Sequence, residues 1–391
     1  MKYAQIVFLA VICLLGLLGI SCIGGGTQPG GWAGVTVHDG IVYAGTLDGR
    51  VVAINATSRD LQWSRPIVTE PSGGLACDPA AVPAAIYTTP IVVGDFIYVG
   101  IYTTHGGRMY ALGISDGEVI WEYPKGGAYI GAIVGRTDID NGIMYVTSSD
   151  STVYALDINR NGLEEWKSEV LDEKGERHEK LWASPVVHNG AVYVSTFDGH
   201  IYALSVETGE LLEWSFKLEA GFASSPVIYE DTIFLGSFDR HLYAVKMGSD
   251  VPLWKFPREN PAGNWFWASP VVNEGIVYAG CLDGKLYAIE AKTGEKLWDF
   301  NAGNPIVSSP VLMGRLLITV DESGTVYVFD LDGELANEAV PWRTIPIGAD
   351  VRSSFCAHEG LVYIRGEDNW IYVVDVDRGQ VSWSFPLTIE G

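Results

Sequence analysis

The chain has 391 residues, of which 48% are hydrophobic and 19% charged, and its formal net charge is −23. An acidic surface repels nucleic-acid phosphates and anionic lipid headgroups, so binding to either through charge is not expected. The 19 tyrosines, 13 tryptophans and 46 glycines favour an all-β fold, because aromatic side chains suit strands and glycine suits tight turns.

Residues 1–22 differ from the rest of the chain and predict an export signal. Lys2 is the only charged residue among them, and residues 6–20 form an apolar run. A run of this length is typical of a signal-peptide core and is short for a membrane-spanning helix. We therefore expect the protein to be exported and to lie on the extracytoplasmic side of a membrane.

The end of this leader suggests how the protein is anchored. Gly19 and Ser21 precede Cys22, and small residues before a cysteine resemble the cleavage box of bacterial lipoproteins, although that box usually has Leu where Gly19 stands. We expect cleavage before Cys22 and acylation of its thiol. Ordinary signal cleavage and a retained anchor are the alternatives.

A glycine-rich segment follows at residues 23–31, with the sequence IGGGTQPGG. Its composition predicts a flexible linker. It also looks like a phosphate-binding glycine loop, but no strand pattern precedes it and no helix pattern follows, so that interpretation is rejected.

One unit then recurs over residues 32–386, and its clearest copy covers residues 267–300. The copy consists of four short runs rich in β-branched and aromatic residues, separated by turns. The turn Asp283-Gly284 suits a type I′ hairpin. Four antiparallel strands with short connections make one propeller blade.

The number of blades follows from two repeated series. The third strand of each unit carries Tyr-Ala or a related pair, and successive tyrosines from Tyr110 onward lie 40 to 48 residues apart, which is the period of a four-stranded blade. A tryptophan closes each unit, and a flat indole suits the wedge between two blades. The closing tryptophans number eight: Trp63, Trp121, Trp166, Trp214, Trp254, Trp298, Trp342 and Trp383. We predict an eight-bladed β-propeller of four-stranded antiparallel blades.

Ring closure can also be predicted from the two ends of the repeat region. The last unit supplies four strands of its own and ends at residues 381–385, whereas residues 23–31 show no strand pattern. We therefore expect the first and last blades to meet by face packing, without a swapped strand.

The repeats resemble those of the PQQ-type, quinoprotein-like propeller family. That family's signature is Ala, then Thr-Gly, three residues and Trp, and here it reads Ala288, Thr293-Gly294 and Trp298. The resemblance covers about nine-tenths of the chain and implies the propeller fold. The regular Gly-His and Trp-Asp pairs of WD-repeat propellers are missing.

The resemblance implies two kinds of function, and the fold does not choose between them. Quinoprotein dehydrogenases hold PQQ and calcium, but they are much longer and carry two adjacent cysteines, which this sequence lacks. Non-enzymatic propeller lipoproteins resembling BamB match the size, the leader and the repeat number. We therefore expect a cell-envelope scaffold that binds protein partners and has no resident cofactor. A PQQ-dependent dehydrogenase and a carbohydrate or small-ligand sensor are the alternatives.

Other reactive residues give weaker signals, and no metal site or catalytic residue is expected. Cys77, Cys281 and Cys356 have no close metal-ligand spacing, and their pairing stays open. Aspartates recur in the turn between the second and third strands, where turn geometry already explains them. His200 and His241 share a repeat position, lack a third ligand, and are interpreted as solvated residues at strand starts.

The strongest candidate site lies just before the innermost strands. Aligning the Ser-Pro pairs of the repeats places bulky residues in equivalent positions at the mouth of the central channel, where they can contact a partner or ligand: Trp32, Tyr87, Trp182, Trp267 and Arg352. Trp265 lies beside them. The alternative is that these side chains plug the channel or pack on the next blade.

The connections between blades place this site on one face. Residues 64–87, 167–181 and 255–266 form long connections, and all three are expected on the face that holds the channel mouth. Long loops in a compact fold are usually functional. We therefore place the working surface on this face.

Overall fold

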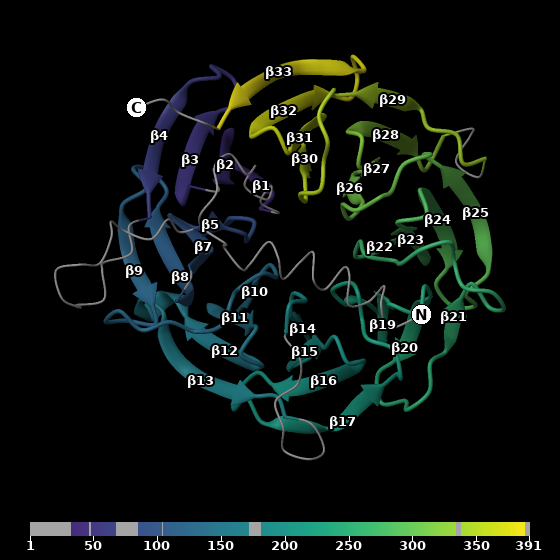
Figure 1. The fold of residues 1–391 in the computed structure, drawn as a ribbon, viewed down its shortest axis with the longest axis horizontal. Helices are drawn as coiled ribbons and strands as arrows, with labels where there is room; N and C mark the ends of the chain where they lie inside the picture. The colour runs from purple at the N-terminus through teal and green to yellow at the C-terminus, as the bar shows by residue number, and fades with distance from the viewer. Residues whose placement is uncertain are drawn as a thin grey trace, which may run out of the picture.

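The computed structural model describes residues 33–46, 48–67, 85–103, 105–171, 181–333 and 338–387. Eight antiparallel sheets are arranged as a ring around a central channel (Figure 1). Each sheet is one blade, with its first strand nearest the axis and its last strand at the perimeter. The prediction of an eight-bladed β-propeller is confirmed. Within the described part of the chain, no helix is long and apolar enough to cross a membrane.

The strands follow one another around the ring in chain order. Blades 1 to 4 contain β1 Val35–His38, β2 Ile41–Gly45, β3 Arg50–Asn55 and β4 Leu61–Pro66; β5 Ala85–Ile86, β6 Ile91–Val93, β7 Phe96–Thr103, β8 Gly106–Gly113 and β9 Val119–Tyr123; β10 Asp138–Asp140, β11 Ile143–Ser148, β12 Thr152–Asp157 and β13 Leu163–Glu169; and β14 Val186–His188, β15 Ala191–Ser195, β16 His200–Ser205 and β17 Leu211–Lys217.

Blades 5 to 8 contain β18 Val227–Tyr229, β19 Thr232–Gly236, β20 Leu242–Lys246 and β21 Trp254–Phe256; β22 Val271–Asn273, β23 Ile276–Gly280, β24 Lys285–Glu290 and β25 Lys296–Asn301; β26 Val311–Met313, β27 Leu316–Val320, β28 Thr325–Asp330 and β29 Arg343–Pro346; and β30 Cys356–His358, β31 Leu361–Arg365, β32 Trp370–Asp375 and β33 Gln380–Pro386.

Blade 2 departs from the simple four-stranded pattern. Its innermost position is occupied by two short strands, β5 and β6, which both pair with β7. The cause is the length of β7, which has eight residues where the equivalent β2 has five. The longer strand leaves room for a second partner on its inner edge.

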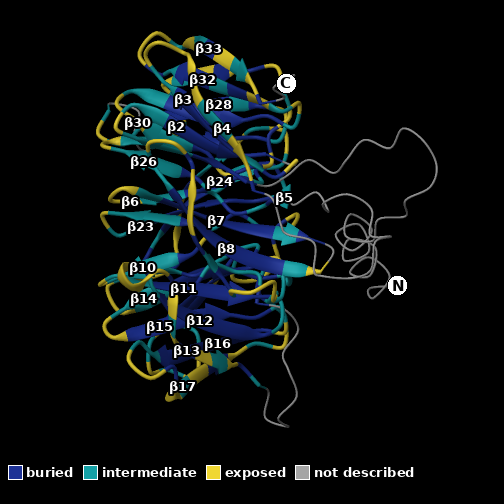
Figure 2. Cartoon of the chain, turned by 90° about the vertical axis from the view of Figure 1, so that its left-hand side faces the viewer, coloured by how far each residue is buried: buried dark blue, intermediate teal, exposed yellow. Residues whose placement is uncertain are grey.

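Packing between blades explains the residue pattern of the strands. The middle strands are buried along most of their length, as in β3, where four consecutive residues are buried. Both faces of such a strand lie against neighbouring blades, so apolar residues occur without alternation. The outermost strands are more exposed, as Figure 2 shows with the disc seen from its side.

The hydrophobic core is divided into eight clusters, and each cluster joins two adjacent blades. The cluster that closes the ring contains Val42 and Ile54 of blade 1 with Tyr363 and Trp383 of blade 8. The first and last sheets each consist of four consecutive strands. They meet by face packing, as expected. Residues 23–31, which would have supplied a swapped strand, lie outside the described residues.

The closing tryptophans make the joints between blades. Trp254 of blade 5 is 7% exposed and donates a hydrogen bond from Nε1 to the Ala291 carbonyl of blade 6 at 2.8 Å. Its indole also covers Gly294, the glycine of the family's Thr-Gly turn. Trp63, Trp166 and Trp214 donate equivalent hydrogen bonds to the next blade. Trp342 differs, because it is 39% exposed.

Candidate functional site

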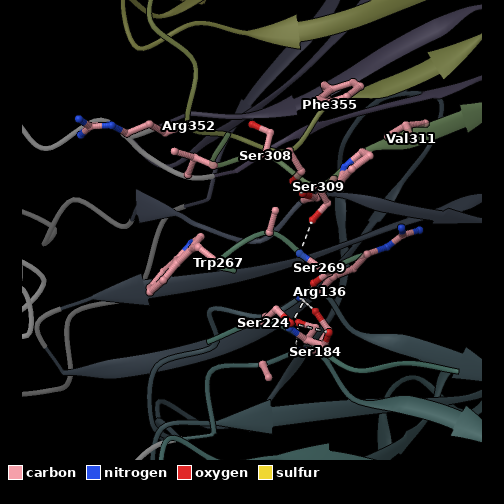
Figure 3. Close-up of a pocket in the computed structure, with 18 of the residues that line it drawn as sticks. Arg136, Ser184, Ser224, Trp267, Ser269, Ser308, Ser309, Val311, Arg352 and Phe355 are labelled. Carbon is pink, nitrogen blue, oxygen red and sulfur yellow. Dashed lines mark hydrogen bonds between the residues drawn. The ribbon is translucent and has the colours of Figure 1, made fainter. Parts of the chain in front are cut away.

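A cavity of about 570 Å³ occupies the central channel (Figure 3). Tyr87, Trp182, Trp267 and Arg352 all line it, as the alignment of the repeats predicts. Each stands four residues before an innermost strand, at β6, β14, β22 and β30 respectively, so the repeat brings each to the same level of the channel. Trp265 does not line the cavity, and Trp32 lies outside the described residues, as does Cys22.

Five aromatic side chains form a continuous row at the channel mouth. The ring centroid of Trp182 lies 5.1 Å from that of Phe197, which in turn lies 5.4 Å from Phe238. Phe238 then contacts Trp265 at 5.3 Å and Trp267 at 6.3 Å. Most of these contacts are edge-to-face, the arrangement that aromatic pairs prefer. We call Trp182, Phe197, Phe238, Trp265 and Trp267 the aromatic row, and all five are partly exposed.

The aromatic row joins two kinds of connection on one face. Trp182 and Trp267 lie in connections between blades, whereas Phe197 and Phe238 lie in the turns between second and third strands. Their contacts show that both kinds of connection share a face. Tyr87 lies elsewhere on the cavity wall and packs on Tyr102 at 6.3 Å.

The mouth is charged on another part of its circumference. Glu322 and Glu367 occupy in blades 7 and 8 the turn position that Phe197 and Phe238 occupy in blades 4 and 5. The exposed Arg352 donates a hydrogen bond from Nε to Glu322 at 2.7 Å. Burial raises the pKa of Glu367, and the nearby Arg352 and Arg365 oppose that rise. The mouth therefore has an aromatic side and a side rich in carboxylates.

Deeper in the channel, hydroxyl groups connect neighbouring blades. The Arg136 backbone N–H donates to Ser184 Oγ at 2.9 Å, Ser184 N–H donates to Ser225 Oγ at 2.8 Å, and the pattern continues to Ser269 and Ser309. Gly34 N–H donates to Thr89 Oγ1, which lies 3.0 Å from Ser354 Oγ. We call Thr89, Ser184, Ser225, Ser269, Ser309 and Ser354 the hydroxyl ring. The serine of the repeated Ser-Pro pair thus bonds one blade to the next.

The repeated aspartates have a structural role in the turns. The phenol of Tyr243 donates to Asp239 at 2.6 Å, and Tyr287 donates to Asp283 at 2.8 Å. The tyrosine that marks the third strand therefore fixes the aspartate of the preceding turn. Among the described residues, no three His, Cys, Asp or Glu side chains group as a metal site would require.

The interpretation of His200 and His241 as solvated residues is wrong. They are 7% and 6% exposed. His200 stacks on Tyr202 with ring centroids 5.4 Å apart, and each imidazole lies within 3.4 Å of the preceding aspartate. Both imidazoles pack on a tyrosine two residues later in their own strand, a contact that the sequence of the turn does not reveal.

Two cysteines in the described part of the chain are free thiols, Cys281 and Cys356. Burial raises the pKa of Cys356 to about 12, and burial raises that of Cys281 as well. A thiol that resists ionisation is a poor nucleophile and a poor metal ligand. Cys77 lies outside the described residues.

Sequence reasoning missed three parts of this site. Phe197 and Phe238 precede their turn aspartates in two blades only, so no repeat signature marks them. The serines of the hydroxyl ring belong to the recurring Ser-Pro pair, which was used to align the repeats but was not itself predicted to line the channel. Arg136 was missed because blade 3 has no Ser-Pro pair to align.

Comparison with known proteins places the chain in a family. A family model described as outer membrane protein assembly factor BamB matches residues 32–123, 85–176 and 248–389. A curated relative, the outer membrane protein assembly factor BamB of Yersinia pestis, is 26% identical over 146 residues. That match covers 34% of this chain and 32% of the relative, so the chain aligns with about a third of the relative's length.

Two solved structures share the fold. The crystal structure of BamB from Moraxella catarrhalis matches with a TM-score of 0.63 and 17% identity, covering 87% of this chain and 92% of that one. The computationally designed Ika8 protein matches with a TM-score of 0.67 and 14% identity, covering 89% and 96%. Because a designed protein fits as well as a natural one, these likenesses show the fold alone.

Proposed function

Because this chain belongs to the family described as outer membrane protein assembly factor BamB, we propose that it is a non-enzymatic scaffold of the cell envelope that binds protein partners. The relative from Yersinia pestis is named for outer membrane protein assembly. A role in envelope protein assembly is the corresponding proposal for this chain. Its supports are the family membership and the surface described above.

The aromatic row carries this proposal. Half-buried tryptophan and phenylalanine side chains on a rigid framework are the residues that most often dominate protein–protein binding. Trp182, Trp265 and Trp267 hold their rings against Phe197 and Phe238, so little side-chain freedom remains to be lost when a partner binds. Because Glu322 at the same mouth is already paired with Arg352, the surface favours a partner segment that carries apolar side chains.

The anchor proposed with this function is a lipid on Cys22. Two or three acyl chains give stable attachment to a membrane, and the glycine-rich residues 23–31 would let the propeller move above it. The working face would then be free to meet proteins of the same compartment.

The experiment compares partner recovery between two double variants. Envelope proteins that co-purify with the wild-type protein are quantified by mass spectrometry. We expect W182A/W267A to lose them, because it removes both ends of the aromatic row. The control E207A/K292A changes exposed residues in turns on the opposite face and should keep them. Equal recovery with W182A/W267A, combined with loss in the control, would overturn the proposal.

The absence of a resident cofactor and of enzyme activity is also part of the proposal. A PQQ-dependent dehydrogenase would reduce an artificial electron acceptor in the presence of PQQ, calcium and an alcohol or sugar. We expect no such reduction by the purified protein. Turnover that requires both PQQ and calcium would replace the scaffold proposal with the enzyme.

A further inference from the structure

The wall of the central channel differs in charge from the rest of the molecule. The chain carries 48 acidic residues and a net charge of −23, yet none of the described residues that line the cavity is Asp or Glu. Apart from cysteine and tyrosine, the titratable residues that line the cavity are Arg136, Arg352 and His358. The cavity is therefore a basic region inside an acidic protein.

Arg136 is the cation that this region leaves without a counter-ion. Arg352 is neutralised by Glu322, with Nη2 2.7 Å from its carboxylate, and His358 lies 3.7 Å from Glu359. Within the described residues, no carboxylate lies within ion-pairing distance of the Arg136 guanidinium. In Figure 3 the Arg136 side chain extends away from Trp267 and Arg352, farther along the channel.

The hydroxyl ring adds hydrogen-bond donors to the cavity that Arg136 also lines. Ser184, Ser225, Ser269 and Ser309 accept backbone N–H groups through Oγ. A hydroxyl that accepts still has its own proton to donate, and no described residue accepts the protons of these four. Hydroxyl donors and a guanidinium are the groups that bind the oxygens of a carboxylate or phosphate, and both line this one cavity.

Apolar side chains line part of the wall, beside further hydroxyl groups from Thr36, Ser224 and Ser308. Val35, Val37, Val134, Val307 and Val311 line the cavity. A volume of about 570 Å³ lies within the usual range of small-molecule pockets, which are mostly apolar with a few placed polar groups. The wall therefore suits an apolar body of small-molecule size with one charged end.

The net negative charge of the protein does not remove this preference. Charges separated by more than the Debye length, about 8 Å at physiological ionic strength, are largely screened. A ligand inside the channel is therefore governed by the wall around it. That wall carries Arg136 and the hydroxyl ring, without a carboxylate among its described residues.

From these observations we propose that the central channel binds an organic oxyanion, with a carboxylate or phosphate end at Arg136 and the hydroxyl ring and an apolar body along the valine-lined wall. This site is independent of the proposed scaffold function, because it requires no partner protein.

The test is isothermal titration of the purified full-length protein with matched probes. Phenylbutyrate and phenyl phosphate carry a carboxylate and a phosphate on an apolar body, and phenylbutanamide is a neutral control. We expect one or both anions to bind at least ten-fold more tightly than the amide. The difference between the two anions tells which end the site prefers.

Two variants with the same change in net charge locate the site. R136Q should remove the preference for the anion over the amide, and R378Q, at an exposed turn outside the channel, should keep it. Unchanged circular dichroism and melting temperature show that R136Q is folded. No binding of either anion, equal binding of the amide, or an anion preference that survives R136Q would overturn the proposal. Partner recovery by R136Q is measured separately, so loss of anion binding with normal recovery leaves the scaffold function standing.

Discussion

At the scale of single residues, the glycine of the Thr-Gly turn explains why the family signature contains both glycine and tryptophan. Gly294 has φ +72°, a conformation that side-chain-bearing residues rarely adopt, and an added Cβ would lie 2.7 Å from Cγ of Trp254 in the preceding blade. Gly117, Gly162 and Gly209 meet Trp63, Trp121 and Trp166 in the same way. The signature therefore records a contact between blades as well as a turn.

Two alanine substitutions in blade 6 separate the contact from the turn. Gly275 has a similar φ of +78°, but an added Cβ there would meet nothing within 4 Å. We expect G275A to cost about 1 to 2 kcal/mol in the free energy of unfolding, from backbone conformation alone. G294A should cost about 1 to 3 kcal/mol more, because the methyl group is forced against the indole. Denaturant titration measures both, and equal losses would show that the contact has no energetic weight.

Buried tyrosines predict how stability depends on pH. Desolvation is the largest cause of a raised phenol pKa, to about 12, at six positions, of which all but the partly buried Tyr372 are buried: Tyr43, Tyr98, Tyr145, Tyr278, Tyr363 and Tyr372. An unfolded tyrosine has a pKa of about 10. Because the folded pKa is higher, the stability from the neutral phenols is complete below about pH 10 and is lost as the pH rises toward about 12.

The measurement is the denaturant midpoint across this alkaline range, with tyrosinate absorbance recorded in parallel. We expect the midpoint to fall above about pH 10, and most phenols to ionise only as the protein unfolds. Full tyrosine titration near pH 10 in a protein that stays folded would contradict the burial of these residues.

At the scale of elements, the closing tryptophans differ in what they contribute to the joint that follows each blade. Trp254 is buried and bonded to blade 6, whereas Trp342 is exposed and stacks under Arg343 at 4.2 Å. We expect W254F to cost about 1 to 3 kcal/mol, because it removes a hydrogen bond to a buried carbonyl along with indole contacts. W342F should change stability by less than about 0.5 kcal/mol. Thermal unfolding of the two variants measures both losses. A larger loss of stability for W342F than for W254F would contradict the difference between the two tryptophans.

The elements also show how much could be predicted from the sequence. Eight blades could be counted because Tyr-Ala or a related pair and a closing Trp recur in every unit, and all of these tryptophans except Trp342 pack where a blade meets its neighbour. The mouth residues Tyr87, Trp182 and Trp267 were placed by the same alignment. Phe197 and Phe238 could not be, since their turn position holds Glu322 and Glu367 in other blades and no shared packing demand fixes it. Burial of His200 was missed because the stacking of its ring on Tyr202 is a packing contact that a strand-start position does not predict.

At the scale of the whole molecule, the scaffold proposal needs an attachment to the membrane. We expect C22A to move the protein from the membrane fraction to the soluble envelope fraction, because the acyl chains would be lost. Mass spectrometry of the wild-type N-terminus should show an acylated Cys22. An unmodified terminus elsewhere, or a C22A protein that stays in the membrane, would favour ordinary signal cleavage or a retained anchor respectively.

The most direct test of the scaffold proposal is photo-crosslinking in intact cells from two positions on opposite faces. A photoreactive amino acid replaces Phe238, in the middle of the aromatic row, or Lys292, in an exposed turn on the other face. We predict a discrete protein adduct from position 238 and none from position 292. An adduct from position 292 with none from position 238 would contradict the assignment of the working face, and no protein adduct from either position would contradict the scaffold itself.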